Sequence, residues 1–262
     1  MTRSAEQLAQ IALQVATEAA QLLHAGFRQH PAVREKGRAD LVTEYDLASE
    51  RLIRKLLGER TPEIPIVAEE QGGTPATEGG LTWYCDPLDG TTNFVHGHFF
   101  YCVSIGVAEA GEPVAGAVVA PELATYWQGY RGGPALRNGE PCRVSDTREL
   151  AHSLVATGFP SDRSQAPGNN FDAFTSVKRQ VRGVRRCGSA AIDLCLVADG
   201  TYDAYWERRL NAWDVMAGSA LVLAAGGRLS GLDRDGTAPD LSVGHVLASN
   251  GLVHDHLLNL IA

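Results

Sequence analysis

The feature that most constrains the fold is an apolar run that ends directly in two aspartates. Residues 81–85 read LTWYC, the pattern of a buried strand, and Asp86 and Asp89 follow within four residues. Aspartate is a poor strand former, and a carboxylate is costly to bury without a partner. A fold that keeps this segment inside must therefore supply something that compensates the two charges.

Composition and charge exclude several classes of protein. Of the 262 residues, 44% are hydrophobic and 21% are charged, as is usual for a globular domain. The formal net charge is −8 and no Lys/Arg run exceeds two residues, so direct nucleic-acid binding is not expected. The N-terminal segment mixes Glu, Gln and Thr with its apolar residues, unlike a signal peptide or a spanning helix. We therefore expect a cytoplasmic protein without a membrane partner.

The five cysteines are scattered and include no C-x-x-C pair. This usage argues against a disulfide framework and against a zinc site. We expect buried thiols.

Periodicity predicts two helices and then a sheet. Ser4 and Gln7 have the spacing of a capping box before a helical pattern that runs to Gly26, and Thr43 is the expected N-cap of a second helix. Short apolar runs from residue 64 to 144 predict an antiparallel sheet backed by these helices, with hairpin turns at 111–113 and 138–139.

Beyond residue 150 helices and strands alternate, which is typical of an α/β arrangement. Helices are expected within 171–181, 189–200 and 213–227, and strands within 153–158, 181–187, 202–207 and 245–249. We predict one compact unit with two halves. Residues 1–150 form an α+β half that holds most of the metal ligands, and residues 151–262 form an α/β half.

Acidic residues stand at the ends of apolar runs in four places along the chain. Side chains at such ends face a crevice, and several carboxylates converging there would repel one another. A divalent cation removes this conflict, and oxygen ligands without histidine or cysteine favour Mg²⁺ over zinc. The residues concerned are Asp40, Asp46, Glu69, Glu70, Asp86, Asp89 and Asp214.

Each of these residues also has a purely structural interpretation. Asp86-Pro87 and Asp89-Gly90 are common turn dipeptides. Asp214 could simply complement the dipole of its helix. The joint pattern favours function, because a turn needs neither a preceding apolar strand nor the Gly-Thr-Thr-Asn that follows.

Residues 90–93 (GTTN) predict a helix entry whose free N–H groups cradle a phosphate, and Gly90 allows the anion to approach closely. Carboxylate-bound metal beside such a phosphate site indicates phosphoryl chemistry.

Three segments resemble the signatures of the inositol monophosphatase family: residues 67–70 (VAEE), 86–94 (DPLDGTTNF) and 213–218 (WDVMAG). The resemblance extends to residues 40–43 with Asp46, to 188–191 and to 205–207, and so covers most of the chain. It implies an α/β fold, a layered αβαβα sandwich, with two or three Mg²⁺ ions per site and sensitivity to Li⁺. It further implies a homodimer that hydrolyses small phosphate monoesters.

The resemblance also implies roles for individual residues. Glu69 and Thr91 would orient a metal-activated water for direct attack on phosphorus. Asp46 would touch a further metal-bound water, and Glu70 would lie outside the direct metal ligands. The implied metal ligands are Glu69, Asp86, Asp89, Asp214 and the backbone carbonyl of Leu88. The implied substrate contacts are Gly90, Thr91, Thr92, Ser189, Ala190 and Glu207. Ser189 is equally well explained as a helix cap.

The substrate is expected to be a small phosphorylated polyol or sugar. Thr92, Asn93 and Phe94 keep the family's pattern, and Glu207 stands where the family binds inositol hydroxyls. Inositol 1-phosphate is therefore preferred over histidinol phosphate, fructose bisphosphate or a nucleotide bisphosphate. A non-catalytic, partner-binding role is the alternative from another class.

Five basic residues stay without an assigned role. His96 and His98 are interpreted as loop or core histidines, and Arg185 and Arg186 as a solvated strand end. Lys36 could lie at the mouth of the site.

Overall fold

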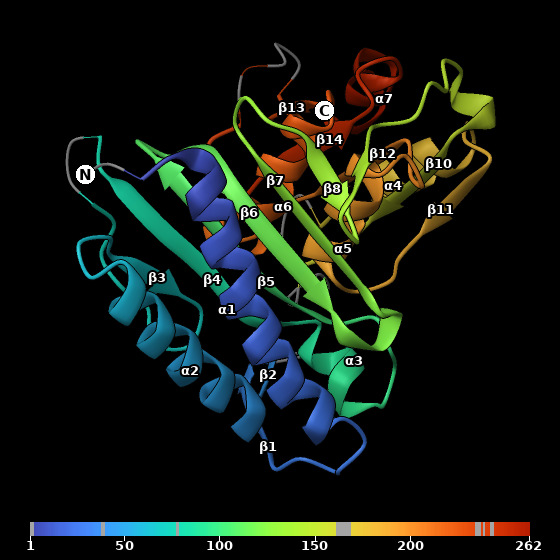
Figure 1. Ribbon diagram of the computed structural model, residues 1–262. Coiled ribbons are helices and arrows are strands. Elements are labelled where there is room, and N and C mark those ends of the chain that lie inside the picture. The colour runs from blue at the N-terminus through green and yellow to red at the C-terminus, as the bar shows by residue number, and fades with distance from the viewer. Residues whose placement is uncertain are drawn as a thin grey trace.

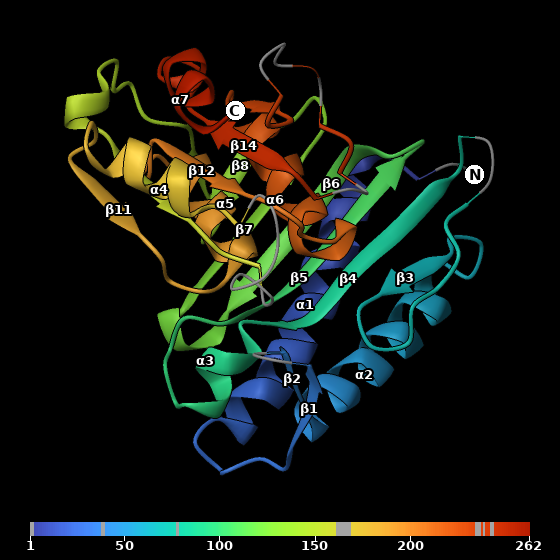
Figure 2. The same cartoon turned by 180° about the vertical axis from the view of Figure 1, so that it is seen from behind.

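Five layers stack in the order helix, sheet, helix, sheet, helix (Figures 1 and 2). The computed structural model describes residues 3–37, 40–76, 79–160, 169–233, 237, 239–241 and 244–262, without the side chains of Lys36 and Asp40. The predicted αβαβα sandwich is confirmed.

The first layer consists of helices α1 (Ala5–Gly26) and α2 (Glu44–Arg60). The predicted capping box is present, because Ser4 Oγ accepts from the Gln7 N–H at 3.2 Å and Gln7 Oε1 accepts from the Ser4 N–H at 2.9 Å. Thr43 caps α2 as expected, and Asp46 Oδ2 accepts a hydrogen bond from the Thr43 N–H at 2.7 Å. These caps satisfy amides that a helix start leaves without partners.

The second layer is a seven-stranded sheet in which the strands lie in chain order (Figure 1). The sheet is backed by α1 and α2, and hairpins join β5 to β6 and β8 to β9 at the predicted turns. Its strands are β3 (Ile66–Ala68), β4 (Leu81–Asp89), β5 (Cys102–Glu109), β6 (Glu112–Ala120), β7 (Thr125–Tyr130), β8 (Ala135–Arg137) and β9 (Glu140–Cys142).

The expectation of a wholly antiparallel sheet is wrong at one edge. Strand β3 pairs parallel to β4, with Ile66 opposite Trp83 and Ala68 opposite Cys85. Parallel neighbours need a crossover of about a dozen residues. Residues 69–80 supply that length, and the crossover begins with Glu69.

Helices α5 (Ala190–Ala198) and α6 (Ala212–Ala224) form the middle layer between the two sheets. A five-stranded sheet follows, and α4 (Phe171–Lys178) and α7 (His254–Ile261) cover its outer face. The strand order is β11 (Gly183–Arg185), β10 (Leu154–Thr157), β12 (Ala204–Glu207), β14 (Val246–Ser249) and β13 (Arg228–Ser230).

Several elements were not predicted. Helix α7, strand β13 and a hairpin of β1 (Val33–Gly37) with β2 (Asp40–Thr43) are additional to the expected set. Short 3₁₀ turns, η1 (Pro121–Leu123) and η2 (Leu150–His152), complete the chain together with α3 (Thr91–Val95). The division into halves near residue 150 stays a prediction.

The expectation of buried thiols is confirmed for three of the five cysteines. All five are free thiols, of which Cys85, Cys102 and Cys195 are buried and Cys142 and Cys187 are half-buried. In the described residues, no helix combines the length and the apolar character needed to cross a bilayer.

Candidate active site

A β-bulge at the end of β4 explains the spacing of the two aspartates. Asp86 lies opposite Ser104 and Asp89 opposite Cys102, so β4 uses three residues where β5 uses two. In a regular strand, positions three apart point to opposite faces, whereas one extra residue returns both to the same face. The bulge also accommodates Pro87, which cannot donate to a ladder.

Asp86 is buried within a group of acids. Its exposed fraction is 2%, and Oδ1 accepts from the Leu88 N–H at 2.9 Å. Burial, followed by the charges of three neighbouring carboxylates, raises the pKa of Asp86 well above its usual value. Those carboxylates are Glu69, Asp89 and Asp214. Residues from three separate segments therefore meet around one side chain.

Asp89 is buried as well but has several donors. Its Oδ2 accepts from Ser189 Oγ at 2.6 Å and from the Ala191 N–H at 2.8 Å. Burial raises the pKa of Asp89, and the bond from Ser189 opposes that shift. Ser189 Oγ also accepts from the Ile192 N–H at 3.3 Å, so the cap interpretation of Ser189 and a place in the site both hold.

Asp214 lies in the first turn of α6, where its Oδ2 accepts from the Asn211 N–H at 2.6 Å. Burial raises the pKa of Asp214 well above its usual value, and the charges of Asp89 and Glu69 add to this effect. The dipole of α6 is favourable for this acid. Asp214 thus caps its helix and also lines the same cavity as Asp89.

Asp46 and Thr91 connect α2 to α3. Asp46 is fully buried, and its Oδ1 accepts from Thr91 Oγ1 at 3.0 Å. The Thr91 hydroxyl also lies 3.1 Å from the Leu88 carbonyl oxygen. Burial raises the pKa of Asp46 to about 6, against the bonds from Thr43. The structure thus holds the Thr91 hydroxyl between a carboxylate and a carbonyl.

Helix α3 begins where the sequence predicts it, directly after Gly90. Gly90 has φ +94°, and a Cβ there would lie 3.0 Å from the Phe100 carbonyl oxygen and 3.3 Å from that of Gly188. Only glycine tolerates both demands. Asn93 donates to the Phe100 carbonyl at 2.6 Å and to the Cys187 carbonyl at 2.9 Å, which ties α3 to the segment before α5. Thr92 is exposed on α3.

A cavity of about 160 Å³ opens beside these acids. Asp89, Asp214 and Glu207 line it together, and Tyr205 Oη donates to Glu207 Oε2 at 2.5 Å. Burial raises the pKa of Glu207 to about 7. The other lining residues are Thr157, Gly158, Arg186, Gly188, Ser189, Ala190, Asp193 and Leu210.

Two residues in the wall of this cavity were given no role there by the sequence. Arg186 is exposed directly after β11, which agrees with the predicted solvated strand end, and it also lines the cavity. Asp193 was not considered. Its exposed fraction is 1%, and its Oδ1 has no hydrogen-bond partner in the described residues. The sequence signal was present, since Asp193 is the one charged residue of α5, AAIDLCLVA.

Gly158 makes room for Glu207. A Cβ at position 158 would lie 1.9 Å from Glu207 Oε2, which is closer than any real contact. A larger residue would therefore displace the carboxylate from the cavity. Sequence reasoning offered no signal for this glycine, because the contact joins residues that are distant in the chain.

The remaining candidates do not join the site. His98 accepts from the Phe100 N–H at 3.4 Å and stacks on Phe99 in the loop after α3, where His96 is also exposed. Arg185 is exposed at the end of β11. The side chains of Lys36 and Asp40 lie outside the described residues.

Several of the acids turn an oxygen towards a hydrogen-bond donor rather than towards one another. In the part of the chain that the structure describes, no three His, Cys, Asp or Glu side chains are arranged around one point as in a metal centre. Nevertheless the donor set fits Mg²⁺. It consists of carboxylates that depress one another's ionisation, and it includes neither thiolate nor imidazole. A hard divalent cation would relieve this repulsion.

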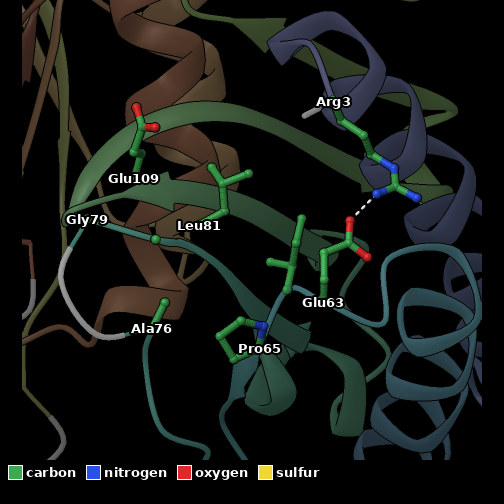
Figure 3. A pocket seen from close by; sticks show the side chains of 9 residues that line it. Arg3, Glu63, Pro65, Ala76, Gly79, Leu81 and Glu109 are labelled. Carbon is green, nitrogen blue, oxygen red and sulfur yellow. Dashed lines mark hydrogen bonds and ion pairs between the residues drawn. The ribbon is translucent and has the colours of Figure 1, made fainter. Parts of the chain in front are cut away.

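A second cavity, of about 480 Å³, lies at the start of β4 near the beginning of α1 (Figure 3). The charged groups described in its lining have partners, because Arg3 pairs with Glu63 and Glu109 with Arg131. Among the described lining residues, Glu63 and Glu109 are the only acids. We therefore place the candidate site at the first cavity.

Comparison with known proteins agrees with this geometry. The sequence profile of the Inositol monophosphatase family matches residues 4–262. The chain belongs to the inositol monophosphatase family. It is 42% identical over 258 residues to an inositol-1-monophosphatase of Synechocystis sp., with 95% of this chain and 88% of that protein covered.

Two further relatives show the range of the inositol monophosphatase family. The solved inositol monophosphatase of Anabaena (Nostoc) sp. PCC 7120 superposes with a TM-score of 0.88 at 37% identity, covering 97% of this chain and 95% of that one. A relative from Pseudomonas aeruginosa is named Nus factor SuhB. It is 38% identical over 257 residues, with 96% of this chain and 94% of that protein covered. The protein is a phosphatase of this family by descent, and its substrate is a separate question.

Proposed function

We propose that the protein hydrolyses a small phosphorylated polyol in a reaction that depends on Mg²⁺, with inositol 1-phosphate as the preferred substrate. One observation carries the proposal. Acids from β4, α6 and the loop after β3 meet around Asp86, beside the start of α3 and a cavity lined by Glu207. The 42% identity to an inositol-1-monophosphatase supports the choice of substrate.

The acids divide into those that hold the ion and those that position other groups. Glu69, Asp86, Asp89, Asp214 and the Leu88 carbonyl would hold Mg²⁺. When bound, the ion would lower the pKa of a water and neutralise phosphate oxygens. Two or three ions per site, a homodimer and a cytoplasmic location remain part of the proposal.

The residues of the chain would then position the reactants. The Thr91 hydroxyl, held by Asp46 at 3.0 Å and by the Leu88 carbonyl at 3.1 Å, would orient the attacking water together with Glu69. The N–H groups of Gly90 and Thr91, at the start of α3, would donate to the phosphate. In-line attack by water requires no covalent phosphoenzyme.

The cavity beyond the acids would bind the alcohol portion. Glu207 would accept hydrogen bonds from ring hydroxyls, and Ser189 and Ala190, which line the same cavity, would offer backbone groups. Thr92 would contact the phosphate from α3. A cavity of about 160 Å³ favours a compact ring over a nucleotide.

Phosphate release from inositol 1-phosphate, measured with and without Mg²⁺, tests the proposal. Histidinol phosphate, fructose bisphosphate and nucleotide 3′,5′-bisphosphate complete the panel, and Asp89→Asn is the inactive control. We expect Mg²⁺-dependent release that is fastest with inositol 1-phosphate. No metal-dependent release from any member would refute the enzymatic proposal, whereas preference for another member would refute only the choice of substrate.

A partner-binding role is the second candidate, and the relative named Nus factor SuhB favours it. Under this alternative the protein would fold normally, and Asp89→Asn would leave its biological role intact. Complementation of a deletion strain by the Asp89→Asn variant separates the two candidates. Rescue supports the partner-binding role, and failure of a stably expressed variant supports the phosphatase.

A further inference from the structure

Glu50 and Arg54 form an ion pair on the inner side of α2. Arg54 Nε lies 2.7 Å from Glu50 Oε1, one helical turn away, and the Glu50 side chain is completely buried while that of Arg54 is 24% exposed. A buried pair is costly unless its remaining hydrogen-bonding capacity is satisfied. The partners that satisfy it therefore indicate what the pair does.

Glu50 binds the backbone directly after Glu69. Its Oε2 accepts from the Glu70 N–H at 2.7 Å, and its Oε1 accepts from the Gln71 N–H at 3.1 Å. Two consecutive backbone amides of the crossover loop thus donate to one carboxylate on α2, about 20 residues earlier in the chain. Charge-assisted bonds of this kind are stronger than neutral ones.

Arg54 binds the carbonyl groups on either side of the same turn. Its Nη1 donates to the Ile66 carbonyl at 3.4 Å, and its Nη2 donates to the Gly72 carbonyl. Gly72 in turn pairs with Ala68 through bonds of 3.1 and 2.9 Å. The ion pair therefore holds both ends and the middle of the turn that carries Glu69.

The turn is also packed too closely to relax by a small shift. A Cβ at Gly73 would lie 2.1 Å from the Ile66 carbonyl oxygen. Moving the loop outward would break four bonds to a buried ion pair at once. The position of the Glu69 backbone is therefore determined by α2.

We propose that Glu50 and Arg54 are positioning residues that fix the Glu69 carboxylate for metal binding, an inference that rests on the proposed Mg²⁺ site. Neither side chain touches the cavity. They act through the backbone of residues 66–72 in the way that outer groups orient metal ligands, whose loss typically weakens metal affinity 10- to 100-fold.

The test compares Glu50→Gln with Glu18→Gln. Glu18 on α1 pairs with Arg60 at the end of α2 at 2.8 Å, so its variant also removes one ion-pair carboxylate, at a half-exposed position. Amide hydrogen exchange of residues 69–72 measures how firmly Glu50 and Arg54 hold the loop, and Mg²⁺ titration calorimetry measures metal affinity. We expect Glu50→Gln to speed exchange and to raise the Mg²⁺ Kd about tenfold, with no change in Glu18→Gln.

Arg54→Lys serves as the second variant, because it keeps the charge at a partly exposed position if Glu50→Gln fails to fold. Lysine lacks the planar guanidinium that donates to two separated carbonyls, so we expect faster exchange and a Mg²⁺ Kd that is about tenfold higher. Unchanged exchange or unchanged affinity in a folded variant refutes the positioning role. Failure of the wild-type protein to bind Mg²⁺ would instead refute the proposed function.

Discussion

Thr91 Oγ1 donates to Asp46 Oδ1 at 3.0 Å, and this bond ties the first residue of α3 to the first turn of α2. The same hydroxyl lies 3.1 Å from the Leu88 carbonyl oxygen. One small side chain thus joins the end of β4 to two helices. Its orientation depends on a carboxylate that lies 45 positions earlier in the chain.

Replacing Thr91 by valine removes this hydroxyl while keeping the shape of the side chain. We expect kcat with inositol 1-phosphate to fall on the order of 100-fold, because correct positioning of a reacting water is worth about that much. Thr17→Val is the control, since Thr17 donates only to the Leu13 carbonyl within α1. Steady-state phosphate release decides the matter, and equal kcat in both variants would contradict the assigned role.

Mg²⁺ should stabilise the folded protein, and more strongly at pH 8 than at pH 5. Burial raises the pKa of Asp46 to about 6 and that of Glu207 to about 7, and it raises those of Asp86 and Asp214 well above the usual value. A carboxyl whose pKa is higher in the folded state stabilises it at low pH. That contribution is lost as the pH rises through the folded-state pKa. A bound cation would then stabilise the fold by offsetting the charges of the ionised carboxylates.

The Asp214→Asn variant tests whether Asp214 contributes to stabilisation by Mg²⁺. At 100 times the Kd, a bound ligand contributes about 2.7 kcal/mol, which corresponds to a rise in Tm of about 5–10 °C for a chain of this size. We expect that rise in the wild-type protein. In Asp214→Asn the metal-free Tm at pH 8 should be higher and the response to Mg²⁺ small. Calorimetric scans with Mg²⁺ or EDTA measure both, and an equal response in the two proteins would argue against Asp214 as a ligand.

Gly158→Ala should impair recognition of the polyol rather than phosphate chemistry. The new Cβ would lie 1.9 Å from Glu207 Oε2, so the carboxylate must leave its place beside Tyr205. Loss of one charged hydrogen bond to substrate corresponds to roughly 10- to 100-fold in kcat/KM. We expect that loss with inositol 1-phosphate and little change with p-nitrophenyl phosphate.

Gly58→Ala is the control for this variant, because a Cβ at Gly58 meets nothing within 4 Å. It should retain activity on both substrates. If Gly158→Ala lost both activities equally, Glu207 would have a role other than binding hydroxyls.

His254 should weaken folding as the solution becomes acidic. The ring is completely buried between Ser249 Oγ at 2.8 Å and Ser230 Oγ at 2.9 Å, and burial lowers the pKa of His254 to about 4. The unfolded chain binds a proton near pH 6.5, so stability falls between pH 6.5 and 4. The loss amounts to at most about 3 kcal/mol.

Urea unfolding from pH 4 to 8 checks this expectation. In His254→Gln the part of the decline due to the ring should be absent. His256→Gln, an exposed change on the same helix, should keep the wild-type profile. A parallel decline in His254→Gln and the wild-type protein would show that other groups cause the acid sensitivity.

Most of the fold could be predicted because the chain obeys simple periodicities. The capping box at Ser4 and the short apolar runs between turn residues each indicate one element without reference to the rest. The hairpin of β1 and β2 was missed because residues 34–36 are charged and show no apolar alternation. The parallel pairing of β3 was missed because strand direction depends on the path of residues 69–80, which periodicity does not describe.

Glu69, Asp86, Asp89 and Asp214 lie close enough to influence one another's pKa, but their immediate partners could not be foreseen. The bond between Ser189 and Asp89 joins residues 100 positions apart, and the burial of Asp193 depends on the packing of α5 between two sheets. Gly158 and Glu50 carry no local signal at all, because their importance lies in what touches them. Residue types indicate chemistry, whereas support for that chemistry arises only from tertiary contacts.

The late position of the Asp89 donors in the chain has a consequence for folding during translation. Ser189 and Ala191 are made about 100 residues after the aspartate that they bind. At the usual speed of translation, this delay lasts on the order of 5 to 20 seconds. During that interval Asp89 lacks the donors of residues 189 and 191, so this end of β4 reaches its final state only after the ribosome has passed α5.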